Sequence, residues 1–253
     1  MSNEPIELGK RLIEYCEKFS IPLEYVFAIL DDQKVVPMIR GKATEYNGYM
    51  AVTNNLSPRE WAVQKLNLNA QPGTDDEDIS VTHKRSGLIL KAECKNAVRG
   101  SMRSGVRARV CNVPHFHVKC HRSRSNIRLA GTSNDRYSID TFDVILCNLS
   151  NALFQGRTVG AELELLHKRN VITMVEAYYG VSTDRELIER AYRDWRFAFP
   201  EEIGEGGFIP RTPVVRLEND PHWRPLQHLD EELTKLVKKR AGEKGSRQRE
   251  SRR

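Results

Sequence analysis

The 253-residue chain has no continuous apolar run of about 18 residues, the length that a membrane-spanning helix needs. Its first residues are charged and lack the apolar centre of a secretory signal, so we expect a cytoplasmic protein with no membrane partner. Cysteine is scarce, with five residues that are scattered and odd in number, which suits a reducing compartment better than a disulfide framework. Neither an internal repeat nor a phosphate-binding loop ending in Gly-Lys-Ser/Thr is evident, so we expect no fused nucleotide-driven motor.

Positive charge is unevenly distributed along the chain. The net charge is +6, and residues 238–253 alone carry eight Lys/Arg against two Glu, so residues 1–237 are neutral overall. Within that neutral part, residues 99–136 hold nine Lys/Arg and a single acid, Asp135. A neutral protein with one strongly basic stretch is suited to bind a polyanion such as DNA. The terminal segment 238–253 is predicted to be a disordered tail that adds nonspecific attraction.

Hydrophobic periodicity and turn signals predict a mixture of helices and strands. We expect helices at 5–19, 42–54, 183–198 and 229–240, the third opened by the capping box that starts at Thr183, and a further helix at 101–110. We expect hairpins at 25–30 with 34–39, at 78–81 with 88–94, and at 115–123 with 126–131. The apolar run at 142–149 is typical of a buried central strand.

These elements predict an α/β fold with a mixed central sheet flanked by helices. The helix and hairpin of residues 1–40 are expected to be part of the same domain as a core at 41–237. The basic segment at about 99–136 is expected to be a DNA-contacting insertion in that core.

Charged residues stand at the ends of the two strands of the predicted hairpin of 78–81 with 88–94. Asp78 opens the first strand, and Glu93, Cys94 and Lys95 end the second. Because side chains alternate along a strand, Glu93 and Lys95 project to the same face, and Asp78 can reach that place if the strands pair. Two carboxylates and the backbone carbonyl of Cys94 are oxygen ligands suited to Mg²⁺, and Lys95 can orient or help deprotonate an attacking water.

A triplet of acid, any residue and base also arises by chance in a chain that is 29% charged. Its position favours a function, however, because it ends the otherwise apolar run 88–94, where charge is costly without a purpose. Asp75 and Asp76 lie beside Asp78 and are alternatives to it as the first carboxylate.

The pattern Asp78…Glu93-Cys94-Lys95 resembles that of the PD-(D/E)xK nuclease superfamily, which includes most type II restriction endonucleases. The resemblance extends over about residues 41–150, and only the catalytic motif is specific. It implies an α/β/α core and Mg²⁺-dependent hydrolysis of duplex DNA that leaves a 5′-phosphate. It also implies a carboxylate from the preceding helix, a place that Glu45 fits. Glu77 stands where the family pattern has proline.

The basic stretch supplies the predicted DNA contacts, because guanidinium groups match phosphate oxygens. The residues assigned to this role are Arg99, Arg103, Arg107, Lys119, Arg122, Arg124, Arg128 and His117. A solvated basic loop is the alternative. Five residues of types that bind zinc also occur here (Cys111, His115, His117, Cys120 and His121), although their spacing matches no familiar zinc knuckle.

We therefore expect a type II restriction endonuclease that uses Mg²⁺ to cut double-stranded DNA at a specific sequence. Two strand breaks are most simply made by a two-fold homodimer, with the C-terminal helices as possible interface elements. The alternatives are a structure-specific repair or recombination nuclease and a DNA-binding protein without catalysis.

Overall fold

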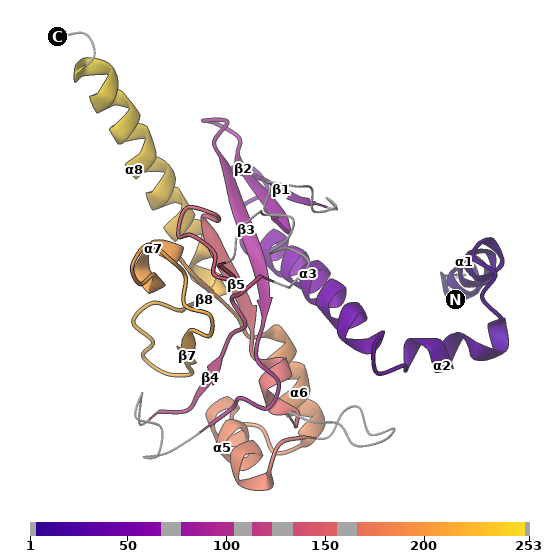
Figure 1. Ribbon diagram of the computed structural model, residues 1–253. Helices are drawn as coiled ribbons and strands as arrows, with labels where there is room; N and C mark the ends of the chain where they lie inside the picture. The colour runs from indigo at the N-terminus through magenta and orange to yellow at the C-terminus, as the bar shows by residue number, and fades with distance from the viewer. Residues whose placement is uncertain (1–3, 67–76, 104–112, 123–133, 156–165, 251–253) are drawn as a thin grey trace. The chain divides into compact units, whose positions relative to one another are not determined.

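The computed structural model describes residues 4–66, 77–103, 113–122, 134–155 and 166–250 (Figure 1). The chain divides into two compact units, Met1–Ala43 and Thr44–Arg253. Within the described residues, none of the helices combines the length and the apolarity that crossing a membrane requires.

The first unit is helical. It contains α1 (Glu4–Lys18), the 3-10 turn η1 (Leu23–Tyr25), α2 (Val26–Leu30) and the beginning of α3 (Val36–Asn55). The predicted helix at 5–19 is confirmed, whereas the predicted hairpin of 25–30 with 34–39 is wrong. Pro37 lies in the first turn of α3, where its missing N–H costs no hydrogen bond, so the apolar run around it starts a helix.

The second unit is built on a six-stranded mixed sheet, so the predicted α/β class is confirmed. The strands are β1 (Trp61–Lys65), β2 (Ile79–His83), β3 (Ile89–Asn96), β5 (Val144–Asn148), β6 (Trp195–Ala198) and β8 (Arg224–Pro225). They lie in the order β1-β2-β3-β5-β6-β8, and β3 pairs with β5 in parallel whereas the other neighbours are antiparallel. All five residues of β5 are buried, as predicted for a central strand.

Each face of the sheet packs against helices. On one face, the strands share a hydrophobic cluster with Val52 of α3, with Leu56 just after that helix, and with Leu233 and Val237 of α8 (Leu229–Glu250). On the other face, a second cluster includes residues of α5 (Arg169–Tyr179) and α6 (Asp184–Arg193). The sheet is therefore the middle of three layers, and β3 lies between β2 and β5 within it.

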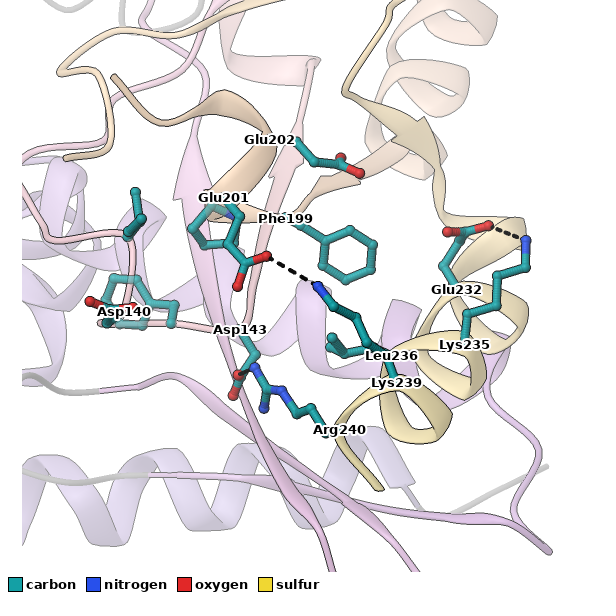
Figure 2. Close-up of a pocket in the computed structure, with 13 residues that line it drawn as sticks. Asp140, Asp143, Phe199, Glu201, Glu202, Glu232, Lys235, Leu236, Lys239 and Arg240 are labelled. Carbon is teal, nitrogen blue, oxygen red and sulfur yellow. Dashed lines mark hydrogen bonds and ion pairs between the residues drawn. The ribbon is translucent and has the colours of Figure 1, made fainter. Parts of the chain in front are cut away.

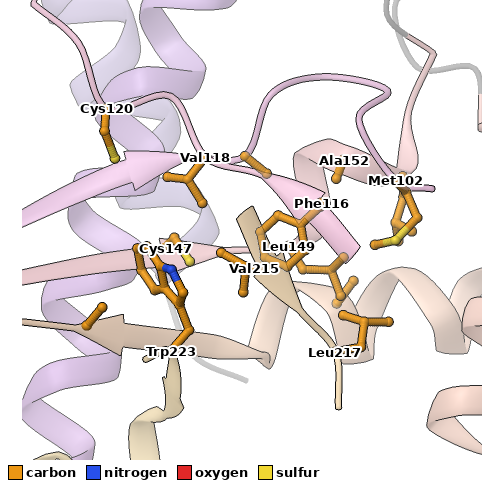
Figure 3. Packing of buried hydrophobic residues seen from close by; sticks show 14 of the residues in the cluster. Met102, Phe116, Val118, Cys120, Cys147, Leu149, Ala152, Val215, Leu217 and Trp223 are labelled. Atoms are coloured by element: carbon orange, nitrogen blue, oxygen red, sulfur yellow. The ribbon is translucent and has the colours of Figure 1, made fainter. Parts of the chain in front are cut away.

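A two-stranded sheet extends the second cluster. It pairs β4 (His115–His117) with β7 (Val214–Arg216). Phe116 and Val215 are fully buried there beside Met102 and Leu149 (Figure 3). The predicted hairpin of 115–123 with 126–131 is therefore wrong where it concerns β4, because the strand that pairs with β4 comes about a hundred residues later in the chain. Residues 123–133 lie outside the described part.

Two predicted helix ends differ from those of the structure. Thr183 caps α6 by accepting a hydrogen bond from the Glu186 amide, as expected, but α6 ends at Arg193 and residues 195–198 form β6. The helix predicted at 229–240 is α8, which continues to Glu250 and so includes most of the segment predicted as a disordered tail. Short helical turns occupy Ser150–Leu153 (η2), Pro200–Ile203 (α7) and Leu226–His228 (η3).

Candidate active site at the end of strand β3

The candidate site lies where β3 extends beyond its neighbour β2. Ile79, the first residue of β2, pairs with Ala92, and β3 continues for four more residues to Asn96. Beyond this pair, the carboxylate of Asp78 accepts a hydrogen bond of 2.8 Å from the Cys94 amide. Because the N–H and C=O of a strand residue point to the same neighbour, the Cys94 carbonyl faces the edge where Asp78 lies.

Glu93 and Lys95 project together from the opposite face of β3 to Cys94. The Lys95 ammonium donates a hydrogen bond to Oε1 of Glu93. The same ammonium lies 3.5 Å from the Tyr137 hydroxyl, 4.7 Å from the centre of the Tyr137 ring and 5.9 Å from that of Phe142. The structure thus gives Lys95 a carboxylate and two aromatic rings as neighbours, which suits a charged amine removed from water.

The Glu93 carboxylate is buried, with only 6% of the residue exposed. Its Oε2 atom has no hydrogen-bond partner among the described residues, although a buried polar oxygen without a partner is costly. Burial raises the pKa of Glu93 to about 8 against the opposing charge of Lys95, and the charge of Asp78 adds to the rise. Burial also raises the pKa of Asp78, with a contribution from Glu45.

Helix α3 brings Glu45 to the same cluster of charges. Its carboxylate accepts a hydrogen bond of 2.9 Å from Lys65 at the end of β1, and that ammonium also donates to the Leu66 carbonyl. The close approach of α3 depends on Gly48, because a Cβ there would lie 2.4 Å from the Cys94 sulfur. The charge of Glu45 therefore reaches the site, since it contributes to the raised pKa values of both Asp78 and Glu93.

The residues present fit a Mg²⁺ ion by the chemistry of their donor atoms. Among the described residues, no three His, Cys, Asp or Glu side chains already form a metal cluster. Mg²⁺ is commonly held by one or two carboxylates with water completing its shell, so Asp78 and Glu93 with the Cys94 carbonyl are a sufficient set. The unpartnered Oε2 of Glu93 is the observation in favour, because a cation would satisfy it.

The described histidines of the zinc hypothesis have backbone contacts of their own. His115 Nδ1 lies 3.0 Å from the Val113 carbonyl, His117 Nδ1 lies 3.5 Å from that of Thr212, and His121 Nδ1 lies 3.1 Å from that of Arg122. Cys120 is buried, and burial raises the pKa of its thiol to about 12. Cys111 lies outside the described residues.

The predicted DNA-contacting residues fall into three groups. Arg103 and Lys119 are exposed: Arg103 forms a β-bridge with His115 of β4, and Lys119 follows β4 by two residues. His117 is half-buried on β4 itself. Arg99 is half-buried, and its guanidinium donates to the Gln155 carbonyl. Residues 107, 124 and 128 lie outside the described part of the chain, as do Asp75 and Asp76, the alternatives to Asp78.

Arg122 is placed differently from its prediction as a phosphate contact. It is only 9% exposed, and its guanidinium donates to the Arg136 carbonyl and lies 4.5 Å from the centre of the Tyr137 ring. Since Tyr137 in turn contacts Lys95, Arg122 packs behind the candidate site.

Tyr137, Phe142 and Lys65 are residues of the site that sequence reasoning missed. Tyr137 and Phe142 follow Lys95 by more than forty positions and come from the segment before β5, and Lys65 ends β1. No local spacing links any of the three to the triplet at 93–95, because only the pairing of β1 with β2 and of β3 with β5 brings them there.

A pocket of about 400 Å³ lies on another side of Phe142, between the segment before β5, α7 and α8 (Figure 2). Its basic side chains are engaged by acids: Lys239 lies 4.0 Å from Glu201, and Arg240 pairs with Asp143. The pocket lining does not include Glu93 or Lys95. The pocket is therefore separate from the candidate site at the end of β3.

Comparisons of the chain with protein-family models, with curated proteins and with solved structures gave no significant match. The site is consequently interpreted from its own residues.

Proposed function

We propose that the chain is a Mg²⁺-dependent endonuclease that hydrolyses duplex DNA, of the type II restriction kind. The observation that carries the proposal is the meeting of Asp78, Glu93 and Lys95 at one end of the sheet. Alternation along β3 and the register of β2 produce this arrangement from residues that the resemblance to PD-(D/E)xK nucleases also selects. The three-layer α/β fold is compatible with such a nuclease, and fold alone does not define function.

Asp78, Glu93 and the Cys94 carbonyl would hold Mg²⁺, with Glu45 as a further carboxylate beside them. When bound, Mg²⁺ supplies Lewis-acid stabilisation of the negative charge that develops on a phosphodiester. Although burial opposes it, the negative charge of Glu93 raises the pKa of Lys95. Lys95 is therefore a cation at neutral pH, so it orients the attacking water by donating a hydrogen bond and stabilises the anionic transition state.

The substrate assignment depends on the basic stretch. Residues 99–136 carry nine Lys/Arg and one acid, and Arg103 and Lys119 present their side chains to solvent. Lys and Arg bind the phosphate backbone of DNA through charge and so position the duplex. Cutting both strands of a duplex at one place needs two active sites, one for each strand. We therefore assign the active form to a homodimer.

The decisive test is cleavage of a plasmid of known sequence by the purified chain with Mg²⁺, followed by sequencing of the ends. Asp78→Asn, Glu93→Gln and Lys95→Met should each lower the rate by at least about 100-fold, because each removes a ligand or the charge next to the reacting group. Lys91→Met is the matched control, since Lys91 alternates onto the same face of β3 but is exposed. It should retain the wild-type rate.

The products separate the possible functions. Discrete, reproducible fragments support restriction, whereas cutting only at junctions or lesions would show a structure-specific nuclease. Binding of DNA that is equal with Mg²⁺ and with EDTA, without any cleavage, would show a DNA-binding protein that lacks catalysis. Near-normal Mg²⁺-dependent activity of one variant would contradict the role given to that residue.

A further inference from the structure

The N-terminal segment of residues 4–43, here called the N-terminal arm, exposes most of the large apolar side chains that solvent reaches. Of the seventeen exposed large hydrophobic residues in the described part of the chain, thirteen lie in this arm. Phe27 and Met38 are 70% and 73% exposed, whereas the buried hydrophobic residues of the arm are Cys16 and Val26. Two buried side chains cannot offset the conformational entropy lost by ordering some forty residues, so the arm needs a partner surface.

Helix α1 carries part of this apolar surface as a regular stripe. Leu8, Leu12 and Tyr15 on α1 and Phe19 just after it are 41–57% exposed and follow one another at spacings of four, three and four. This alternation is that of the seam along which two helices of a coiled coil pack. The rings of Tyr15 and Phe19 lie 4.7 Å apart, centre to centre, so they continue one ridge.

The charges of the arm favour a partner protein surface that carries both signs of charge over DNA or an anionic membrane. Residues 1–43 hold seven acids and six bases, whereas binding to phosphate or to anionic lipid requires an excess of Lys and Arg. On α1, opposite charges recur four residues apart at Glu7 and Arg11 and at Lys10 and Glu14. A surface that carries both signs in this way can pair with a two-fold copy of itself.

We propose that the N-terminal arm is the surface through which two copies of this chain associate. A large apolar side chain that is half exposed offers about 100 Å², so the thirteen side chains of the arm offer at most roughly 1,300 Å², and a two-fold pair would bury at most about 2,600 Å². Obligate homodimers bury areas of this size, in contrast to weak encounters, which bury less than about 1,200 Å². The proposal follows from surface and charge, whatever reaction the chain catalyses.

Sedimentation equilibrium of the full chain tests the proposal. The wild type should have twice the mass of the 29.1 kDa chain. The variant Leu8→Glu/Leu12→Glu should associate at least about 100-fold more weakly, because the two-fold pair would bury each new carboxylate once in each copy. Phe27→Glu on α2 should act in the same direction. Tyr192→Glu is the matched control, since Tyr192 is a 49% exposed apolar residue on α6 outside the arm, and it should leave the mass unchanged.

A second measurement uses the unaltered sequence and so does not depend on folding of the variants. Mixed copies labelled with ¹⁴N and ¹⁵N are crosslinked at lysines, and mixed-isotope pairs between Lys10 and Lys18 are expected. A monomeric wild type would overturn the proposal, whether the arm then folds on its own chain or binds anionic vesicles. A dimer that survives the substitutions in the arm, without mixed-isotope pairs there, would also overturn it and place the interface elsewhere.

Discussion

Replacement of Lys95 by methionine should destabilise the metal-free protein by an amount that depends on pH in a defined way. The carboxyl of Glu93 is buried, and its pKa is raised from 4.5 in an unfolded chain to about 8. Between these two values the native state binds more protons than the unfolded state, so the stability of the wild type falls as the pH rises through this window. It stops falling, as far as Glu93 is concerned, above about pH 8.

Lys95 holds this pKa down, since its positive charge opposes the effect of burial. Without it, Glu93 stays protonated to a higher pH and the window of falling stability extends upward. The difference in unfolding free energy between wild type and Lys95→Met should thus be constant below about pH 8. Above it, the difference should grow by about 1.4 kcal/mol per pH unit, which is the free energy of one pKa unit.

The assay is urea unfolding in EDTA at several pH values between about 6 and 9.5, a range that spans the wild-type pKa of Glu93. Titration of other groups is common to both proteins and cancels in the difference. The double variant Glu93→Gln/Lys95→Met should show no growth above pH 8, because the titrating carboxyl is gone. A difference between wild type and Lys95→Met that stays constant over the whole range would refute the coupling of Glu93 to Lys95.

Three further variants test the packing of α3 and the predicted DNA contacts. Gly48→Val should lower the free energy of unfolding by about 1–3 kcal/mol and reduce cleavage, because its side chain would overlap the Cys94 sulfur and push α3 away. In Gly41→Ala, on the same helix, the added methyl meets no atom within 4 Å. This variant should stabilise the protein by roughly 0.5–1 kcal/mol, measured by thermal unfolding. Arg103→Ala/Lys119→Ala should weaken binding of a DNA duplex and reduce the salt slope of log K by about 2, since each lost phosphate contact removes about one. An unchanged slope would place both residues away from the DNA.

The predictions that succeeded rest on patterns with one structural interpretation. The apolar run containing β5 is short, rich in β-branched and aromatic residues, and buried on both faces, as expected of a central strand. The capping box at Thr183 specifies a helix start by a hydrogen bond between residues three positions apart, so the signal is contained in the local sequence. The common face of Glu93 and Lys95 follows from strand alternation alone.

The predictions that failed depended on contacts from elsewhere in the chain. The apolar run around Pro37 fits either a strand or the first turn of a helix, and periodicity over six residues does not separate them. Residues 195–198 continue a helical pattern in sequence, but all four are buried against β5 and β8, so sheet pairing decides their conformation. Tyr137 lies in the segment before β5, and it meets Lys95 because β5 pairs with β3.

The hydrogen bond from the Cys94 amide to Asp78 has a consequence for how the site is assembled. The carboxylate stands where the backbone of a neighbouring strand would otherwise continue, so it meets Cys94 only when Ile79 faces Ala92. A slip of one residue would turn Glu93 and Lys95 to the opposite side of the sheet. A nascent or partly unfolded chain therefore has the charged residues but not their alignment. If the chain is the nuclease proposed above, it would become able to cleave only after the β2–β3 register has formed.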